Sequence, residues 1–206
     1  MEKTCDSDKI GKKSLKTRDY ILNITFMGLM TALICVLAPL SIPLPGQVPL
    51  SLTLVVIYIA VYLLGGVKGT ACVVLYLIIG LIGLPVFSGF SGGVGKLAGP
   101  TGGYLAGFIF TAAVCGAFLK IGKGRIWVYI VGMILGCAAA YIFGTVWFMF
   151  SMGTDLKYTL SVCVIPFLPF DAVKIAAVAI AGPPVKKLLL RMDGMQSIIK
   201  GRQKNK

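Results

Sequence analysis

Charge is scarce in this sequence, and histidine is absent. Only 13% of its 206 residues are charged and 57% are hydrophobic, and the mean hydropathy is +0.92. An ordinary soluble domain has about 25% charged residues, so a soluble enzyme, a disordered chain and a nucleic-acid-binding module are all excluded for want of polar surface. The lack of histidine excludes histidine-based metal sites, catalytic triads and proton relays. The composition predicts a single membrane domain.

Acidic residues are also few, and the basic residues that outnumber them lie mainly at the two ends of the chain. The sequence has 7 acidic and 20 basic residues, which gives a formal net charge of +13. Residues 1–19 contain six of the basic residues and residues 186–206 contain seven, whereas residues 20–185 contain seven with only two acids. We interpret the net charge as a signal of membrane topology and not of nucleic-acid binding. The predicted parts are a basic cytoplasmic tail at 1–19, a six-helix membrane domain at 20–190 and a basic cytoplasmic tail at 191–206.

Long uncharged runs fill the middle of the chain, the longest from residue 20 to residue 67. A helix that spans a bilayer needs about 20 mostly apolar residues. Clusters of proline and glycine divide the runs, because repeated prolines cannot continue a helix. We therefore predict an all-α integral membrane protein, a bundle of six transmembrane helices, the last of which ends before Pro183 and Pro184. The predicted helices cover about 20–38, 50–66, 69–83, 104–119, 126–149 and 159–182.

Six spans would place both termini on one side of the membrane. That side then carries 17 of the 20 basic residues, whereas the other side carries only Lys96 and Lys157. Cytoplasmic segments are enriched in lysine and arginine, so we predict that both termini are cytoplasmic. Five or seven spans would separate the two basic tails. The basic residues of the predicted cytoplasmic turns are Lys68, Lys120, Lys123 and Arg125.

Small residues recur every fourth position in three of the predicted helices. Such a stripe lets another backbone approach closely, either inside the bundle, which we favour, or on a second membrane subunit. The six cysteines form no CxxC pair, so we interpret them as small apolar packing residues and predict no disulfide and no metal site. The stripes are Gly132, Gly136, Ala140 and Gly144; Gly103, Gly107, Thr111 and Cys115; and Gly28 and Ala32.

A glycine-rich loop separates the third and fourth predicted helices on the outer side. Eight glycines and two prolines between Gly83 and Tyr104 exclude a continuous helix. The loop keeps apolar and aromatic residues, which favours a folded cap over a cavity rather than a loose connection. A nucleotide-binding P-loop is excluded because the pattern GxxxxGK[ST] is missing.

The last predicted helix carries an acid and a base, Asp171 and Lys174, three positions apart and so on one face. A charge inside a bilayer costs about 2.5–3.5 kcal/mol on insertion scales. Pro166 and Pro169 place Asp171 near a helix start, where the helix dipole favours an anion. The pair is either a structural ion pair or, as we favour, a polar recognition point in an apolar pocket.

Taken together, these motifs resemble the BioY family, the biotin-specific S components of energy-coupling factor (ECF) transporters. The resemblance lies in Gly83-Leu-Pro-Val-Phe87, Gly92-Gly93, Gly99-Pro-Thr-Gly-Gly-Tyr104, Pro169-Phe-Asp171-x-x-Lys174 and Val48-Pro-Leu-Ser-Leu52. It implies six helices in a bacterial cytoplasmic membrane and capture of biotin from outside. It also implies partners: a transmembrane coupling subunit and two ATP-binding subunits. The sequence departs from the family pattern at Thr53, where a glutamine is expected, and at Val36, where the alanine stripe of the first helix is broken.

The resemblance and the residue chemistry together predict the contacts with biotin. Asp171 would accept a ureido N–H, Lys174 would pair with Asp171 or contact a ligand oxygen, and Lys96 would hold the carboxylate. Aromatic walls and a closing backbone would come from the glycine-rich loop, and the first helix would dock the coupling subunit. The predicted walls are Phe87, Phe90 and Tyr104, the closing residues are Gly99, Pro100, Thr101, Gly102 and Gly103, and the docking residues are Gly28 and Ala32.

Three other functions were weighed against this hypothesis. An S component for another vitamin is the nearest alternative. A stand-alone secondary transporter would more typically show inverted repeats, and the sequence has no clear repeat. A membrane enzyme would need a catalytic cluster, so we predict that the chain is not an enzyme and uses no cofactor.

Overall fold

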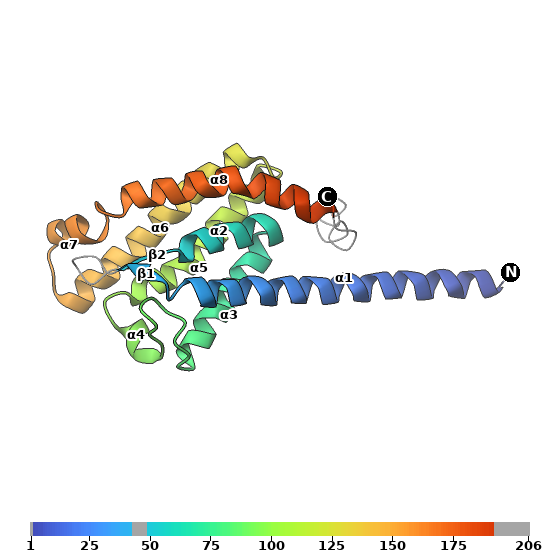
Figure 1. Ribbon diagram of the computed structural model, residues 1–206, viewed down its shortest axis with the longest axis horizontal. Coiled ribbons are helices and arrows are strands. Elements are labelled where there is room, and N and C mark those ends of the chain that lie inside the picture. Colours follow the sequence, from blue (N-terminus) through green and yellow to red (C-terminus); the bar gives the residue numbers. More distant parts are fainter. Residues whose placement is uncertain (1, 43–48, 192–206) are drawn as a thin grey trace.

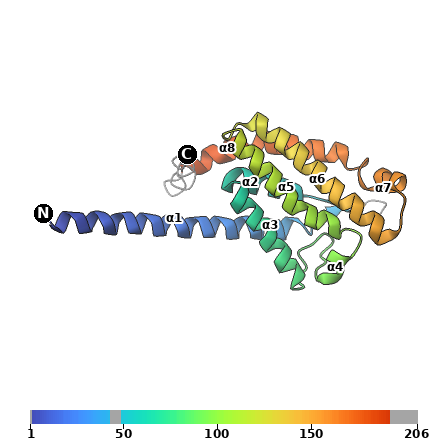
Figure 2. The ribbon, with the colours of Figure 1, turned by 180° about the vertical axis from the view of Figure 1, so that it is seen from behind.

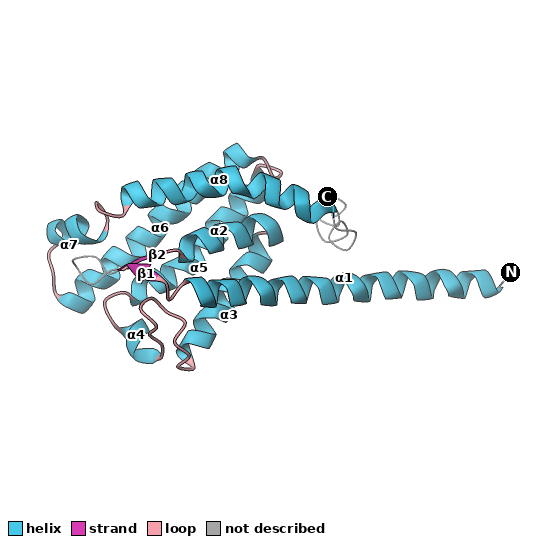
Figure 3. Ribbon diagram, in the orientation of Figure 1, coloured by secondary structure: helices cyan, strands magenta, loops and turns pink. Residues whose placement is uncertain are grey.

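Helices make up most of the computed structural model, which describes residues 2–42 and 49–191 (Figures 1 and 3). One small two-stranded sheet lies beside them. The elements in chain order are α1 (Glu2–Leu37), β1 (Ser41–Ile42), β2 (Leu50–Ser51), α2 (Thr53–Leu64), α3 (Gly66–Leu81), α4 (Val94–Ala98), α5 (Gly102–Ile121), α6 (Ile126–Met152), α7 (Leu156–Cys163) and α8 (Leu168–Arg191).

Four segments of the described chain are long and apolar enough to cross a membrane, which supports the predicted class of helical membrane protein. They are Tyr20–Leu37 of α1, Gly102–Ile121, Ile126–Met152 and Leu168–Leu189. The second and third predicted spans correspond to shorter apolar helices, Thr53–Leu64 and Gly66–Leu81. The six-span bundle requires that α2 and α3 also cross the membrane, and this stays a prediction. The first helix begins at Glu2, so it also covers residues 2–19 of the predicted tail.

The predicted break after the first span is confirmed. Helix α1 ends at Leu37, before the proline-rich stretch. Instead of continuing as a helix, the chain forms an antiparallel pair in which Ser41 lies opposite Ser51 and Ile42 lies opposite Leu50. This ribbon leads directly into α2, so it sets the position of the first turn of that helix.

The last predicted span differs from the structure at both ends. Its first part is a separate helix, α7, which ends at Cys163, and α8 begins at Leu168 after Pro166. The prediction that the span ends before Pro183 was wrong, because α8 continues through Pro183 and Pro184 to Arg191. Each proline removes one helical hydrogen bond, but contact with α2 supports the helix: a Cβ on Gly182 would lie 3.2 Å from the Tyr62 ring.

Two of the small-residue stripes pack against each other inside the bundle, as we favoured. Helices α5 and α6 run side by side in both ribbon views (Figure 2). The Thr111 hydroxyl donates to the Gly136 carbonyl over 2.8 Å, and the Cys115 thiol donates to the Gly132 carbonyl over 3.3 Å. A Cβ on Gly107 would lie 3.0 Å from the Cα of Ala140. These contacts require backbones in close approach, which the small residues permit.

The third stripe, on α1, faces away from the rest of the described chain. Gly28 and Ala32 are both exposed, and a Cβ on Gly28 would meet nothing within 4 Å. Leu29, Leu33 and Val36 on the same stretch are also exposed. This face of α1 is therefore unpartnered within the described residues, whereas Met30 and Ile34 on the opposite face are buried in the core.

The glycine-rich loop is folded against the helices. It contains the short helix α4, and its two halves approach each other at a bridge between Phe87 and Ser91. Gly93 has a φ of +85°, which favours glycine, and its N–H donates to the Gly80 carbonyl over 2.7 Å. The Trp147 indole of α6 donates to the Gly99 carbonyl over 2.9 Å. Such backbone contacts hold the loop over the bundle, as expected for a cap.

The α5–α6 contact predicts that Gly136→Ile destabilises the isolated protein. A Cβ at this position would lie 2.9 Å from the Cys115 sulfur and 3.0 Å from the Thr111 carbonyl oxygen. Overpacking of this kind costs about 1–3 kcal/mol. Thermal unfolding of the detergent-solubilised variant should begin at a clearly lower temperature than in the wild type. Gly28→Ala, at the open position on α1, is the control and should unfold no earlier than the wild type, because alanine is the better helix former.

Candidate ligand-binding site

An ion pair between Asp171 and Lys174 lies in the first turns of α8. The Lys174 Nζ atom is 2.8 Å from Asp171 Oδ1, and the two residues are 9% and 5% exposed. It is the one salt bridge found among the described residues. As the prolines predicted, Asp171 lies in the first turn of its helix. The pair is therefore buried and charged, in a helix that is otherwise mostly apolar.

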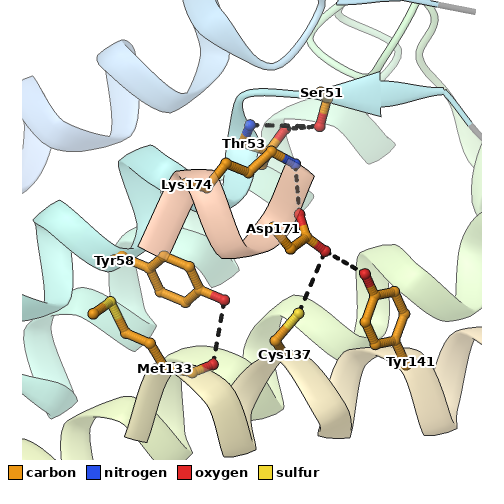
Figure 4. Close-up of polar contacts among 8 residues, drawn as sticks. All are labelled: Ser51, Thr53, Tyr58, Met133, Cys137, Tyr141, Asp171 and Lys174. Carbon is orange, nitrogen blue, oxygen red and sulfur yellow. Dashed lines mark hydrogen bonds and ion pairs between the residues drawn. The ribbon is translucent and has the colours of Figure 1, made fainter. Parts of the chain in front are cut away.

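The second oxygen of Asp171 is held by helix α6 (Figure 4). The Tyr141 hydroxyl and the Cys137 thiol both donate to Asp171 Oδ2, the thiol over 3.4 Å. The two donors are four positions apart and so share a face of α6. Tyr141 is not among the predicted site residues, and Cys137 was predicted only as a packing residue. The sequence does contain a signal for these two donors, because a tyrosine follows a cysteine by one helical turn in an otherwise apolar span.

A hollow with about 480 Å³ of empty space adjoins the ion pair. The wall is mostly apolar, and the polar groups gather around Asp171. This arrangement favours a recognition site over a closed structural ion pair. The lining residues, from β2, α2 and α5 to α8, include Leu54, Tyr104, Phe108, Ala140, Cys163 and Phe167.

A second hollow, with about 360 Å³ of empty space, lies next to the first. The two share Pro49, Ser51, Tyr104 and Phe108 in their walls. No charged residue of the described part of the chain lines the second hollow, whereas five further residues with mostly neutral polar side chains do. The two hollows therefore form one composite site with a charged end and a neutral end. The residues that line only the second hollow are Thr53, Tyr76, Ser88, Thr101 and Leu105.

Four of the predicted site residues border this composite site: Asp171, Lys174, Tyr104 and Thr101. Tyr104 lines both hollows, is 9% exposed, and donates its hydroxyl to the Cys163 carbonyl over 3.3 Å. Gly144 gives it room, because a Cβ there would lie 2.3 Å from the Tyr104 ring.

The glycines of the predicted closing segment fit the loop onto its neighbours. A Cβ on Gly102 would lie 1.6 Å from the Leu97 carbonyl oxygen, and a Cβ on Gly103 would lie 2.2 Å from the Trp147 Cβ. The Gly99 carbonyl accepts the Trp147 indole N–H. Together with Pro100, these residues line neither hollow. Their contacts hold Thr101 and the start of α5 at the site.

Three other predicted residues lie away from the hollows. Phe87 is fully buried in the core, with its ring edge-on to Tyr76 at 5.5 Å. Phe90 is 66% exposed with a φ of +54°. Lys96 lies on α4, is partly buried, and lines neither hollow. Contacts of Phe87, Phe90 and Lys96 with a ligand stay predictions.

Thr53, where the sequence departs from the expected family pattern, is part of the composite site. It is 2% exposed, lines the second hollow, and shares a 2.8 Å hydrogen bond with the Ser51 hydroxyl. Ser51 lines both hollows and comes from β2. This position therefore keeps a buried polar group, although threonine has a shorter side chain than the expected glutamine.

Comparison with known proteins gives one consistent family. Residues 8–191 match the BioY family. The chain is 39% identical over 161 residues to the biotin transporter BioY of Thermotoga maritima, covering 78% of this chain and 94% of that one. It is 31% identical to the biotin transporter BioY of Rhizobium etli, covering 83% and 94% of the two chains.

The fold agrees with a solved structure of the same kind. The crystal structure of the S-component for biotin from an ECF-type ABC transporter superposes with a TM-score of 0.76 and 31% sequence identity. The match covers 82% of this chain and 92% of the other. On both sequence and structure, this chain belongs to the BioY family.

Proposed function

We propose that this chain is the biotin-binding S component of an ECF-type ABC transporter and takes part in biotin uptake. The observation that carries the proposal is the buried Asp171–Lys174 pair beside a hollow, in a chain of the BioY family. The names of its relatives, which are biotin transporters, support the same ligand.

The free hydrogen-bonding groups of the pair suit the ureido ring of biotin. That ring has two N–H donors and a C=O acceptor. A carboxylate has about four acceptor positions, and the contacts described use both positions on Asp171 Oδ2 and one on Oδ1. One acceptor position on Oδ1 and two N–H groups of Lys174 are left. Side by side, they match the adjacent N–H and C=O of a cyclic urea.

The rest of the first hollow suits the apolar part of biotin. Leu54, Phe108, Ala140 and Phe167 supply aliphatic and aromatic surface around the polar end. A thiophane ring buried there would be removed from water, which contributes about 25 cal/mol per Å² of apolar surface. Charged contacts thus give orientation, and the apolar walls give most of the affinity.

ATP-driven transport by this chain would need partners, because the sequence contains no P-loop motif for nucleotide binding. In the proposed assembly a transmembrane coupling subunit and two ATP-binding subunits supply the energy. The exposed stretch of α1 around Gly28 and Ala32 is the proposed docking surface for the coupling subunit. The proposed location is a bacterial cytoplasmic membrane, with six spans and both termini in the cytoplasm.

Asp171→Asn should weaken biotin binding by roughly tenfold to a hundredfold, because a hydrogen bond to a charged group contributes about 1.5–3 kcal/mol. Titration calorimetry on the detergent-purified protein measures the affinity. Asp155→Asn is the matched control, since Asp155 is exposed and lines neither hollow.

The small molecule that copurifies with the wild-type protein should be biotin, as identified by mass spectrometry. Competition with other unlabelled vitamins should leave biotin bound. Displacement of biotin by another vitamin at a lower concentration would assign the chain to a different substrate. Unchanged biotin affinity in Asp171→Asn would mean that the Asp171 carboxylate does not contact the ligand.

Reporter fusions should place both ends of the chain in the cytoplasm. The start of α1 and the end of α8 lie toward the same end of the molecule (Figure 1). A reporter that is active only in the cytoplasm should work at both termini and at Lys123, and should fail at Lys157. Activity at one terminus only would require an odd number of spans.

Ala32→Leu should reduce recovery of the coupling subunit without reducing biotin affinity. A larger side chain would hold a partner helix away from the stripe, while Ala32 lies outside both hollows. Copurification from cells that express the whole transporter measures the first effect. Ile142→Leu, at an exposed position on α6, controls for exposed apolar residues elsewhere. Full recovery with Ala32→Leu would move the docking surface away from this stretch.

A further inference from the structure

Three exposed cations lie close together at the turn between α5 and α6. They are Lys120, Lys123 and Arg125. One candidate membrane span ends at Ile121 and the next begins at Ile126, so the turn lies where this helix pair reaches the membrane surface. None of the three cations makes an ion pair with a residue in the described part of the chain. Their charges therefore lie at the depth of phospholipid headgroups and are not neutralised there.

The backbone of this turn has a fixed shape. The N–H groups of Lys123, Gly124 and Arg125 all donate to nearby carbonyls, over 2.9–3.2 Å. Lys123 and Gly124 have φ values of +50° and +81°, which reverse the direction of the chain in a tight turn. A Cβ on Gly122 would lie 2.5 Å from the Val128 Cβ, so the turn packs directly on the first turn of α6. The cations are thus presented from a rigid backbone rather than from a loose loop.

No acidic residue occurs in the turn or in the two helices that it joins. The single acid of α8, Asp171, is paired with Lys174 near the other end of that helix. Helix α8 brings a further cation to the turn, because Lys186 Nζ would lie 3.7 Å from a Cβ on Gly124. The same Nζ lies 4.8 Å from the centre of the Tyr62 ring. The neighbouring helices therefore strengthen the positive potential of the turn.

Large apolar side chains adjoin the cations on both sides. Ile121 is 71% exposed and Trp127 is 78% exposed. Tryptophan is enriched where a membrane protein meets the boundary between hydrocarbon and headgroups. An acidic protein surface would complement the cations alone. A phospholipid complements both features, because its phosphate suits the cations and its acyl chains suit the apolar side chains.

We infer that the α5–α6 turn is a binding site for an anionic phospholipid. The lipid phosphate pairs with Lys120, Lys123 and Arg125, and the acyl chains lie against Ile121 and Trp127. Cations near a membrane surface attract anionic lipids, and arginine can bind two phosphate oxygens at once. This inference goes beyond the proposed function, because none of these residues lines either hollow. In the proposed topology the lipid belongs to the cytoplasmic leaflet.

The experiment compares two lipids in one sample. The detergent-purified full chain is mixed with equal amounts of phosphatidylglycerol and phosphatidylcholine, and native mass spectrometry measures how much of each stays bound. The wild type should prefer phosphatidylglycerol. The double variant Lys123→Gln/Arg125→Gln should lose roughly tenfold or more of that preference, as expected when two cations near a membrane surface are removed. The ratio of the two lipids does not depend on how much of the sample is folded.

The matched control is Arg18→Gln/Lys157→Gln, which removes the same two kinds of charge at exposed positions on α1 and α7. It should keep the wild-type preference. Inorganic phosphate at the concentration of the lipid should leave phosphatidylglycerol bound, because it offers nothing to Ile121 and Trp127.

Three results would overturn the inference: no lipid preference in the wild type, an equal loss in both double variants, or displacement of phosphatidylglycerol by inorganic phosphate. An unchanged lipid preference in Lys123→Gln/Arg125→Gln, together with poorer recovery of the coupling subunit, would assign the cations to an acidic protein partner instead. The lipid measurement uses no biotin, so its result is independent of the proposed function.

Discussion

The burial of one carboxylate is the constraint on which the rest of the site depends. A charged side chain in an apolar bundle is unfavourable by several kcal/mol unless it is paired and hydrogen-bonded. Asp171 meets that condition through Lys174 on its own helix and through Tyr141 and Cys137 on α6. These partners also fix the carboxylate in one orientation at the wall of the hollow.

The small residues of α5 and α6 contribute to the site through packing. Because the Thr111 and Cys115 side chains donate directly to carbonyls of α6, the two helices are locked in close approach. Close approach brings the neighbouring face of α6, with Cys137 and Tyr141, within reach of α8. On the same seam, Gly144 leaves space for the Tyr104 ring, which lines both hollows.

The two hollows of the composite site are lined by different kinds of side chain. Charged groups border only the first hollow, while hydroxyl groups and a helix N-terminus border the second. A folded glycine-rich loop holds Thr101 at that second end through backbone contacts that leave no room for larger side chains.

The sequence by itself determined the membrane class, the break after α1, the folded nature of the glycine-rich segment and the pairing of Asp171 with Lys174. Each of these follows from local spacing or from residues that cannot enter a helix. Only the tertiary structure decided the partners from other elements, such as Tyr141, Ser51 and Phe108, and the passage of α8 through Pro183. Membrane helices are apolar on every side, so their periodicity does not reveal which face looks inward, and that choice is made by packing between helices.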